Sequence, residues 1–295
     1  MSEPPDLEEL RAQAFAMAYR MLGSVSEAED IVQEALLRLH LVLQQGERIE
    51  SPGAYLSTIV TRLCIDQLRS ARVRRESYVG EWLPEPLVDD GRSDPAGHAE
   101  LADSLSLAFL VLLESLTPEQ RAAFLLREVF DYPYEQIAAI IGTSEDNTRQ
   151  LVARARKHVD ERRPRFEASQ ERREQLSRSF LAAISNGDLH ALEELLAHDV
   201  TLHGDGGGQV RAITRPIHGR AKVARALLSM VRAAEAFGGL SLRHVHVNGQ
   251  PGAMVSDAAD KLIAVEVLDI ADGHIQAVRA IVNPDKLRHL HQATS

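Results

Sequence analysis

The sequence predicts a multidomain protein in which two all-α domains precede an α+β domain. Apolar residues recur at helical spacing through about residue 166, and Leu, Ala and Arg, which favour helices, are frequent. From about residue 172, two helical segments are followed mainly by alternating or apolar segments that glycine-containing turns separate. Helices followed by a run of antiparallel strands are typical of an α+β domain.

Length and composition limit the class of protein further. The chain has 295 residues, enough for two or three domains. No apolar run reaches the roughly 18 residues of a membrane-spanning helix, and the N-terminus lacks a signal-peptide pattern, so we expect a cytoplasmic protein without a membrane partner. The single cysteine, Cys64, excludes an internal disulfide and a cysteine-based zinc site, and we expect it in a helix core.

The charge is unusual for a protein that binds nucleic acid alone. The formal net charge is −10, and residues 1–165 carry most of the acidic excess. Because neutralisation of phosphates normally drives binding to DNA, this balance argues against a free-standing DNA-binding protein. A local basic surface on an acidic body suggests a protein that a larger partner delivers to DNA.

Helix-start signals divide the first half of the chain. Residues 8–46 predict two helices that Gly23 and Ser24 separate, with a capping box at Ser26–Glu29 for the second. Ser51 and Pro52 begin a third helix. This helix runs into residues 69–75, which hold four arginines and no acidic residue. Thr117–Gln120 provide another cap, with proline at the first helical position.

Residues 134–157 predict a helix-turn-helix. Tyr134–Ile141 form a short helix with Ile137, Ala138 and Ile141 inward, Gly142 permits a left-handed exit, and Ser144 caps the second helix. In that helix Thr148, Leu151 and Val152 face inward. The positions that remain for solvent or phosphate are Arg149, Gln150, Arg154, Arg156 and Lys157. Such a helix can enter a major groove; the alternative is two packed surface helices with solvated arginines.

Residues 77–103 differ in composition from the helical segments that precede them. This stretch is rich in proline and acidic residues and holds the only tryptophan of the chain. We interpret it as a linker outside the regular elements. Trp82, Leu83 and Leu87 are unusual for a linker that is only solvated. At the other end of the chain, Asn283 and Pro284 predict a turn before a short helix.

The helical half resembles a bacterial extracytoplasmic-function sigma factor of RNA polymerase. Residues 26–39 resemble the region-2 helix that docks on the polymerase clamp, 52–76 the segment for the promoter −10 element, and 116–157 region 4. Three ordered blocks are more specific than one. WLPEPL (82–87), DGGG (205–208) and NPDKL (283–287) resemble the sigma-J-like group, which fuses a SnoaL-like domain behind region 4.

The resemblance covers nearly the whole chain and implies four parts. They are region 2 in 1–76, the linker in 77–103, region 4 in 104–166 and a SnoaL-like regulatory domain in 172–295. The implied partners are core RNA polymerase, through its β′ clamp and β flap, and promoter DNA. Asp30, Gln33 and Glu34 lie on one helical turn and would dock on the polymerase; the alternative is an ordinary solvated acidic face.

The resemblance also implies two sets of DNA contacts. Binding of unstacked −10 bases needs stacking side chains and basic grooves, and the candidates are Tyr55, Thr58, Arg62, Arg69 and Arg72. Tyr55 could equally be a core residue. For the −35 element the candidates are Arg149, Gln150, Ala153, Arg154, Arg156 and Lys157. Arginine pairs with guanine and glutamine with adenine, but Ala153 and the apolar Leu151 depart from the family pattern, so shape readout carries more of the specificity.

The C-terminal domain resembles the cone-shaped fold of SnoaL-like polyketide cyclases. His203, Asp205 and His218 would line its pocket, and Asp with His can act as a general acid and base. The alternatives are a vestigial pocket or one that binds a small-molecule ligand without turnover, and we expect a protein that is not an enzyme. We expect no cofactor and no metal: His244 and His246 share a strand face without a third ligand, as a solvated strand face would.

These segments suggest regulation within one chain. We hypothesise that the SnoaL-like domain packs on the linker, stands in for a separate anti-sigma protein, and controls the spacing of regions 2 and 4. The candidate contacts are Trp82, Leu83, Pro84, Asp205, Gly206, Gly207, Asn283, Pro284, Asp285, Lys286 and Leu287.

Two other functions remain open at this level. One is a SnoaL-like isomerase, hydrolase or ligand sensor with a DNA-binding head, whose turnover would depend on His203 or Asp205. The other is a repressor that binds its operator without polymerase. The acidic body and the docking helix favour the sigma factor over the repressor.

Overall fold

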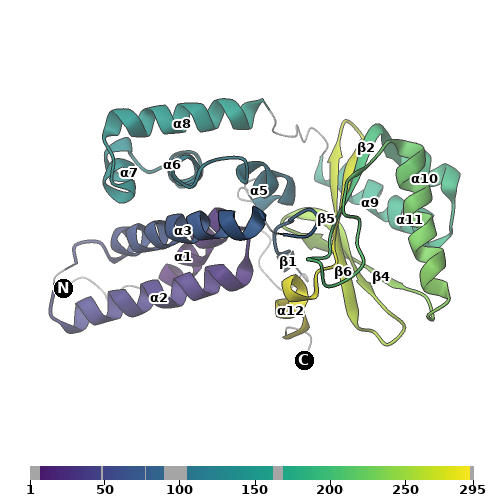
Figure 1. The fold of residues 1–295 in the computed structure, drawn as a ribbon, viewed down its shortest axis with the longest axis horizontal. Helices are drawn as coiled ribbons and strands as arrows, with labels where there is room; N and C mark the ends of the chain where they lie inside the picture. Colours follow the sequence, from purple (N-terminus) through teal and green to yellow (C-terminus); the bar gives the residue numbers. More distant parts are fainter. Residues whose placement is uncertain (1–6, 48, 77, 90–104, 162–168, 293–295) are drawn as a thin grey trace. The chain divides into compact units, whose positions relative to one another are not determined.

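The structure, a computed structural model, describes residues 7–47, 49–76, 78–89, 105–161 and 169–292. Within these ranges the side chains of 72–76 and 291–292 are not described. The chain divides into two compact units, which are treated separately below. The helical unit comprises residues 1–77 and 110–163, and the sheet unit comprises residues 78–109 and 164–295 (Figure 1).

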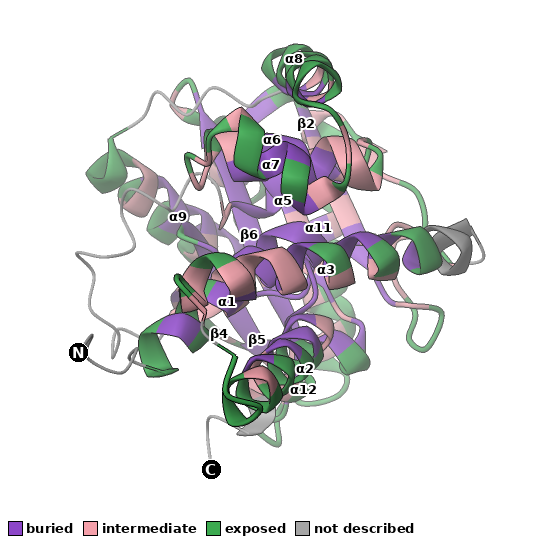
Figure 2. Ribbon diagram, turned by 90° about the vertical axis from the view of Figure 1, so that its left-hand side faces the viewer, coloured by how far each residue is buried: buried purple, intermediate pink, exposed green. Residues whose placement is uncertain are grey.

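The helical unit holds two groups of helices whose inner faces are buried (Figure 2). Tyr19, Leu22, Leu39 and Cys64 are almost completely buried in the first group, which confirms Cys64 as a core residue. The helices of the two groups are α1 (Leu7–Leu22), α2 (Val25–Gln44) and α3 (Pro52–Glu76), then α6 (Pro118–Glu128), α7 (Tyr134–Ile141) and α8 (Glu145–Asp160). The unit boundary falls inside α5 (Leu107–Leu113).

Most of the predicted helix starts are confirmed, and one is wrong. α3 begins at Pro52, and Thr117 forms the predicted capping box with Gln120. α2 begins earlier than predicted, because Ser24 is its N-cap and its hydroxyl accepts a hydrogen bond from the backbone N–H of Glu27. The predicted box at Ser26 therefore lies inside the first turn.

The helix-turn-helix is confirmed with one change. Gly142 adopts the left-handed conformation (φ 72°, ψ 43°) and Ser144 caps α8 by accepting from the backbone N–H of Asn147. Inside α7, Ile140 is buried to 5% exposure, whereas the predicted Ile141 is only partly buried. Ile140 lies three residues after the fully buried Ile137, so it shares its face.

The sheet unit contains one seven-stranded mixed sheet with the order β1-β4-β5-β6-β7-β2-β3. The predicted antiparallel run holds for β4 to β7, but β2 pairs in parallel with β7. The linker, expected outside regular elements, supplies the edge strand β1. The strands are β1 (Val88–Asp89), β2 (Leu196–Asp205), β3 (Ile217–His218), β4 (Ser241–Val247), β5 (Gln250–Ser256), β6 (Leu262–Ala271) and β7 (His274–Ile281).

The two faces of this sheet have different covers. Residues directly paired across strands point to the same face, so Leu202, Val278 and Leu268 share one face, and these three belong to the apolar core. We call it the helix face, because α9 (Gln170–Ser185), α10 (Leu189–Leu195) and α11 (Arg220–Glu235) cover it (Figure 1). The opposite face, which we call the linker face, lies toward the linker and α12 (Pro284–Gln292).

Among the residues that the structure describes, no helix combines the length and the apolar character needed to cross a membrane.

Replacement of Ser144 by alanine tests the cap that places α8. Loss of an N-cap hydroxyl costs about 1 kcal/mol, so we expect roughly fivefold faster amide exchange in the first turns of α8. Hydrogen exchange followed by mass spectrometry measures this. The control is Ser70→Ala, because Ser70 is an exposed residue in the C-terminal part of α3, far from that helix's N-cap. Equal exchange in the two variants would contradict the cap assignment.

Candidate functional sites

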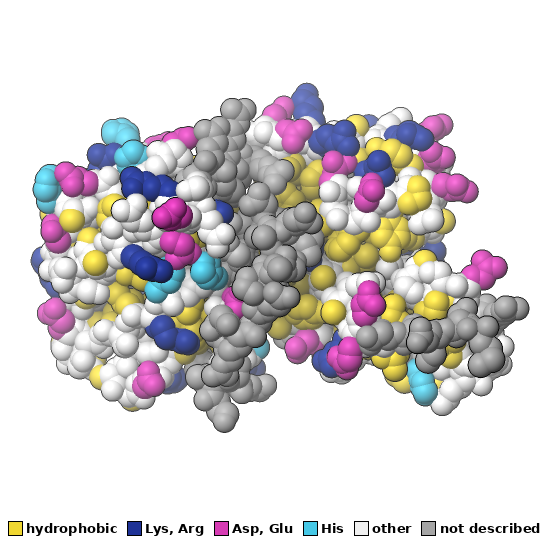
Figure 3. All heavy atoms as spheres, turned by 180° about the vertical axis from the view of Figure 1, so that it is seen from behind, with side chains coloured by type: hydrophobic (Ala, Val, Ile, Leu, Met, Phe, Trp, Pro, Cys, Tyr) yellow, Lys and Arg dark blue, Asp and Glu magenta, His cyan; other side chains and the backbone are white. Residues whose placement is uncertain are grey.

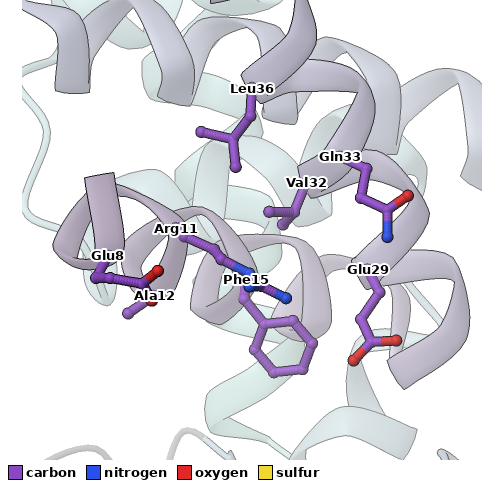
Figure 4. A pocket seen from close by; sticks show the side chains of 8 residues that line it. All are labelled: Glu8, Arg11, Ala12, Phe15, Glu29, Val32, Gln33 and Leu36. Atoms are coloured by element: carbon purple, nitrogen blue, oxygen red, sulfur yellow. The ribbon is translucent and has the colours of Figure 1, made fainter.

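The predicted polymerase-docking residues lie on the exposed side of α2. Asp30, Gln33 and Glu34 are all exposed, and Glu34 forms an ion pair with Arg38 at 2.7 Å. Gln33 also lines a groove of about 630 Å³ between α1 and α2 (Figure 4). The groove is lined by Glu8, Arg11, Ala12, Phe15, Glu29, Val32, Gln33 and Leu36.

The C-terminal half of α2 also exposes apolar side chains. Leu37, Leu41 and Leu43 are 53%, 46% and 42% exposed. Exposed apolar side chains that gather in one region mark an interaction site more often than scattered ones. The combination of groove, polar rim and exposed leucines makes α2 a surface suited to a large partner.

Two of the predicted −10 residues on α3, Arg62 and Arg69, contact α7 and α6 of the same unit. Tyr55 and Thr58 are partly exposed, Arg62 and Arg69 are exposed, and the side chain of Arg72 lies outside the described residues. The Arg62 guanidinium donates to the carbonyl oxygens of Ile140 and Ala139 at 2.9 and 3.0 Å. These carbonyls end α7, where the helix dipole favours a cation.

Two further contacts join the same helices. Arg69 forms an ion pair with Glu119 of α6 at 2.8 Å, and the hydroxyl of Tyr132 donates to Ser57 at 2.8 Å. The Glu119 hydrogen bond raises the pKa of Arg69. Two of the donors that the sequence assigned to −10 DNA, Arg62 and Arg69, are thus engaged by protein groups.

A buried arginine strengthens this junction. Arg121 of α6 is 2% exposed, forms an ion pair with Glu114, and donates to the backbone carbonyl of Arg20 at 3.1 Å. Burial lowers the pKa of Arg121 to about 9. Arg121 was not predicted from the sequence, because an arginine in the first turns of a helix is usually solvated.

The predicted −35 residues form one exposed surface of α8. Arg149 packs over the ring of Tyr134 with 4.4 Å from the guanidinium carbon to the centroid, and it pairs with Glu145. Arg156 pairs with Glu128. All six predicted positions are exposed: Arg149, Gln150, Ala153, Arg154, Arg156 and Lys157. On the face in Figure 3, basic and acidic side chains are interspersed.

The sheet unit brings the three sigma-J-like strings together on its linker face. Asp205, at the end of β2, is fully buried and is the centre of the contacts. Its carboxylate accepts from the hydroxyl of Tyr78 at 2.6 Å and from the backbone N–H of Leu83 at 2.8 Å. Burial, together with the Asp205 carboxylate, raises the pKa of Tyr78.

Lys286 of α12 completes this centre. Its ammonium is 2.7 Å from the Asp205 carboxylate and donates to the carbonyl oxygen of Leu83. The nitrogen also lies 4.2 Å from the ring centroid of Trp82 and 5.2 Å from that of Tyr78, distances that permit cation–π attraction. One buried cation therefore joins the linker, β2 and the C-terminal helix.

The DGGG string (205–208) allows two segments of the backbone to approach each other closely. Gly207 adopts a left-handed conformation (φ 60°), and a Cβ there would clash with the side chain of Asn283. Asn283 in turn donates to the Tyr78 hydroxyl at 2.9 Å. Only glycine satisfies both the backbone conformation and the available space.

A second anchor lies further along the linker. Asn248 exchanges two hydrogen bonds with the backbone of Leu87 and donates to the carbonyl of Leu105. A ring nitrogen of His289 is 2.8 Å from the carbonyl oxygen of Pro86. The sequence analysis missed Tyr78, Asn248 and His289; an aromatic residue four positions before Trp82 was the one available signal.

Most of the predicted regulatory residues gather at this site. Leu83, Pro84, Gly206, Asn283 and Leu287 are buried there. Pro284 and Asp285 are exposed at the start of α12, and Asp285 accepts a hydrogen bond from Gln209.

The expectation that His203, Asp205 and His218 line the domain's pocket is wrong. His203 and Asp205 share a face, but it is the linker face, because their pairing partners Arg279 and Ile281 lie opposite the helix-covered row of Val278. A ring nitrogen of His203 lies 2.8 Å from Glu81 of the linker, and His218 is exposed.

His244 and His246 are also placed differently from the prediction. They are not on a solvated strand face, because Glu174 of α9 contacts both rings. Burial lowers the pKa of His244. Within the described ranges, no group of three or more His, Cys, Asp or Glu residues could hold a metal ion.

Comparison with known proteins identifies the family. The family models for sigma-70 region 2, sigma-70 region 4 and the SnoaL-like domain match residues 7–74, 106–159 and 177–278. The chain is 37% identical to the ECF RNA polymerase sigma factor SigJ of Mycobacterium tuberculosis, over 96% of this chain and 93% of that protein. It is 34% identical to the probable ECF sigma factor SigI of the same species, over 94% and 92%.

A solved structure agrees with this likeness. The crystal structure of Mycobacterium tuberculosis SigJ matches with a TM-score of 0.76 at 34% identity, over 96% of this chain and 98% of that chain. The chain therefore belongs to the extracytoplasmic-function sigma factors of RNA polymerase, and within them it resembles the members with a C-terminal SnoaL-like domain.

Replacement of Asp205 by alanine should release the linker. The change leaves the Lys286 ammonium buried without its anion, which typically costs 3–5 kcal/mol, about half of the stability of a typical domain. Because Trp82 is the single tryptophan, its fluorescence reports the state of the linker, and we expect a red-shifted emission and a lower denaturation midpoint.

The matched control is Asp199→Ala, because Asp199 is an exposed residue of the same strand. We expect it to leave the Trp82 emission unchanged. Identical emission spectra for the two variants would show that the ion pair does not hold the linker.

Proposed function

We propose that this protein is a sigma factor that binds core RNA polymerase and directs transcription from specific promoters. The observation that carries the proposal is the match of the whole chain to sigma factors, combined with an exposed polar face on α8. The net charge of −10 fits this function, since polymerase supplies most of the affinity for DNA and the sigma factor supplies specificity.

Each predicted surface of the helical unit has a role in this proposal. Asp30, Gln33 and Glu34, with the groove between α1 and α2, contact the β′ clamp of the polymerase, and the region-4 helices contact the β flap. α3 binds the −10 element through Tyr55, Thr58, Arg62, Arg69 and Arg72. α8 reads the −35 element through Arg149, Gln150, Ala153, Arg154, Arg156 and Lys157.

The contacts within the helical unit require a rearrangement before DNA binds. Arg62 and Arg69 cannot bind phosphate while they contact the end of α7 and Glu119. Exposed ion pairs contribute about 0–1 kcal/mol, so these contacts can be exchanged for DNA contacts without a large cost. We therefore assign the structure to a closed state of regions 2 and 4.

The sheet unit has a regulatory role in this proposal. The linker that follows region 2 is held by Asp205, Lys286 and Asn248, so a change in these contacts alters the freedom of the chain between regions 2 and 4. In this proposal the linker is 77–103, region 4 is 104–166, and the regulatory domain is 172–295.

A catalytic role for the SnoaL-like domain has little support. The residues expected to act as acid and base are engaged elsewhere, His203 with Glu81 and Asp205 with Lys286. We propose that the domain is not an enzyme, that the protein acts in the cytoplasm, and that a small-molecule ligand binds the SnoaL-like domain without turnover.

Binding of the purified full-length protein to core polymerase, followed by run-off transcription from genomic fragments, tests the function. We expect binding and promoter-dependent transcripts. Binding to an operator in the absence of polymerase would favour a repressor, and turnover of a substrate would favour an enzyme with a DNA-binding head. Failure to bind core polymerase would refute the sigma-factor assignment.

Replacement of Arg154 by alanine tests recognition by α8. Loss of one base contact costs about 1–3 kcal/mol, so we expect roughly 10- to 100-fold weaker promoter binding by the holoenzyme and unchanged binding to core polymerase. Arg232→Ala, an exposed arginine on α11, is the control for the loss of one charge. If both variants bind promoters equally, α8 does not read the −35 element through Arg154.

Replacement of Glu119 by glutamine tests the closed state. It removes one of the two carboxylates that pair with Arg69 and leaves the other, Asp66 of α3, so we expect up to about fivefold tighter binding of single-stranded −10 DNA by the free protein. Fluorescence anisotropy with a labelled oligonucleotide measures this affinity. Glu135→Gln, an exposed acid on α7, controls for the change in net charge. The closed-state assignment fails if Glu135→Gln raises the affinity as much as Glu119→Gln.

A further inference from the structure

One row of residues, with one residue from each of five neighbouring strands, crosses the helix face. The middle residue of this row is the acid Glu266. The strand register pairs His244 with Ala253, Ala253 with Glu266, Glu266 with Ala280, and Ala280 with Gly204. These residues therefore point to one face, the face that carries Leu268 and Val278 two residues along their strands. Small residues, Ala253 and Ala280, flank Glu266 on both sides.

One carboxylate oxygen of Glu266, the fully buried Oε2, has no hydrogen-bond partner among the described residues. Burial raises the pKa of Glu266 to about 7. Buried ionisable groups are normally paired or hydrogen-bonded, because an isolated charge in an apolar environment is costly. A native buried acid without a partner needs an explanation, and an absent ligand is one.

A second unpaired polar group lies on the helix that covers this row. Glu174 of α9 contacts His244 and His246, which places this part of α9 over β4. Ser177 follows one turn later, is fully buried, and its hydroxyl has no hydrogen-bond partner among the described residues. Two helical residues three positions apart share a face, so Ser177 points toward the same layer.

The residues around Glu266 and Ser177 are mostly apolar, and several of them are partly exposed. Glu266 and Ala280 are partly exposed, although their neighbours Val267 and Val278 are buried. Leu181 and Leu242, which pack against the apolar core, are also only partly buried. Binding sites for small molecules combine apolar walls with a few polar groups in this way.

We propose that the helix face of the SnoaL-like domain binds a small molecule with an apolar body and a primary amine, whose ammonium pairs with Glu266 and Ser177. This inference rests on the proposed ligand-binding role of the domain and names the chemistry of its ligand. An ammonium group has three donors and no acceptor, whereas the ionised carboxylate and the hydroxyl oxygen both accept. The apolar body replaces the missing side-chain volume above Ala253 and Ala280.

Other ligand chemistries fit the layer less well. A carboxylate would be repelled by Glu266, and a purely apolar molecule would leave Glu266 and Ser177 unpaired. A neutral alcohol can accept or donate one hydrogen bond, but it cannot balance the carboxylate charge. Charge-assisted hydrogen bonds are roughly twice as strong as neutral ones. The amine is therefore distinguished from the alcohol by its dependence on Glu266.

Benzylamine and benzyl alcohol form a matched pair of probes for this site. Calorimetric titration of the full-length protein should show benzylamine binding more tightly than benzyl alcohol. In Glu266→Gln, which keeps shape and removes charge, benzylamine binding should fall by about 10-fold or more, as expected for loss of a charged hydrogen bond, while alcohol binding stays constant. Ser177→Ala should weaken amine binding by a smaller factor.

Glu235→Gln is the control, since Glu235 is an exposed acid at the end of α11. Thermal unfolding of each variant checks that it folds; if Glu266→Gln does not fold, the Ser177→Ala comparison decides. Equal binding of amine and alcohol, or amine binding that Glu266→Gln leaves unchanged, would overturn the proposal. Core-polymerase binding is measured in parallel, so that failure of the ligand site is distinguished from failure of the sigma-factor function.

Discussion

The buried ion pair between Asp205 and Lys286 is the interaction on which the linker face of the sheet unit depends. Transfer of both charges from water is costly, and only a fully hydrogen-bonded arrangement offsets this cost. Asp205 meets the condition by accepting from Tyr78, Leu83 and Lys286. Because these partners come from the linker and α12, the pair fixes both segments on the sheet. Residues 78–89 of the linker are held in place by this carboxylate, together with the second anchor at Asn248 and His289.

In the helical unit, by contrast, the arginine contacts of α3 lie at the surface. Arg62 and Arg69 remain exposed, and their partners are carbonyl groups at a helix end and a surface carboxylate. Such contacts are weak and screened by salt. The described part of the linker is thus held by buried charges, whereas the arginines proposed to bind DNA are held by exposed contacts that DNA phosphates can replace. This difference fits the proposal of a specific regulatory site and a DNA-binding surface that opens.

Local signals made much of the fold predictable. Glycine and proline positions, N-caps and helical periodicity located the helix-turn-helix at Gly142 and Ser144, since these effects act within a few residues. The parallel pairing of β2 with β7 and the pairing of β1 from the linker were missed, because they depend on segments distant in sequence. The same limit explains the error over His203: alternation shows which residues share a face, but not what covers that face. Asp205 was assigned both to a pocket and to the linker, and the tertiary structure selects the linker.

The central claim is that the docked linker controls the activity of this sigma factor. Run-off transcription by holoenzyme reconstituted with Lys286→Met, read together with Trp82 emission and core-polymerase binding, tests it most directly. The account predicts that Trp82 is released and transcription changes while core binding is retained. Released Trp82 with unchanged transcription would contradict the account, because the linker contacts would then stabilise the fold without regulating initiation.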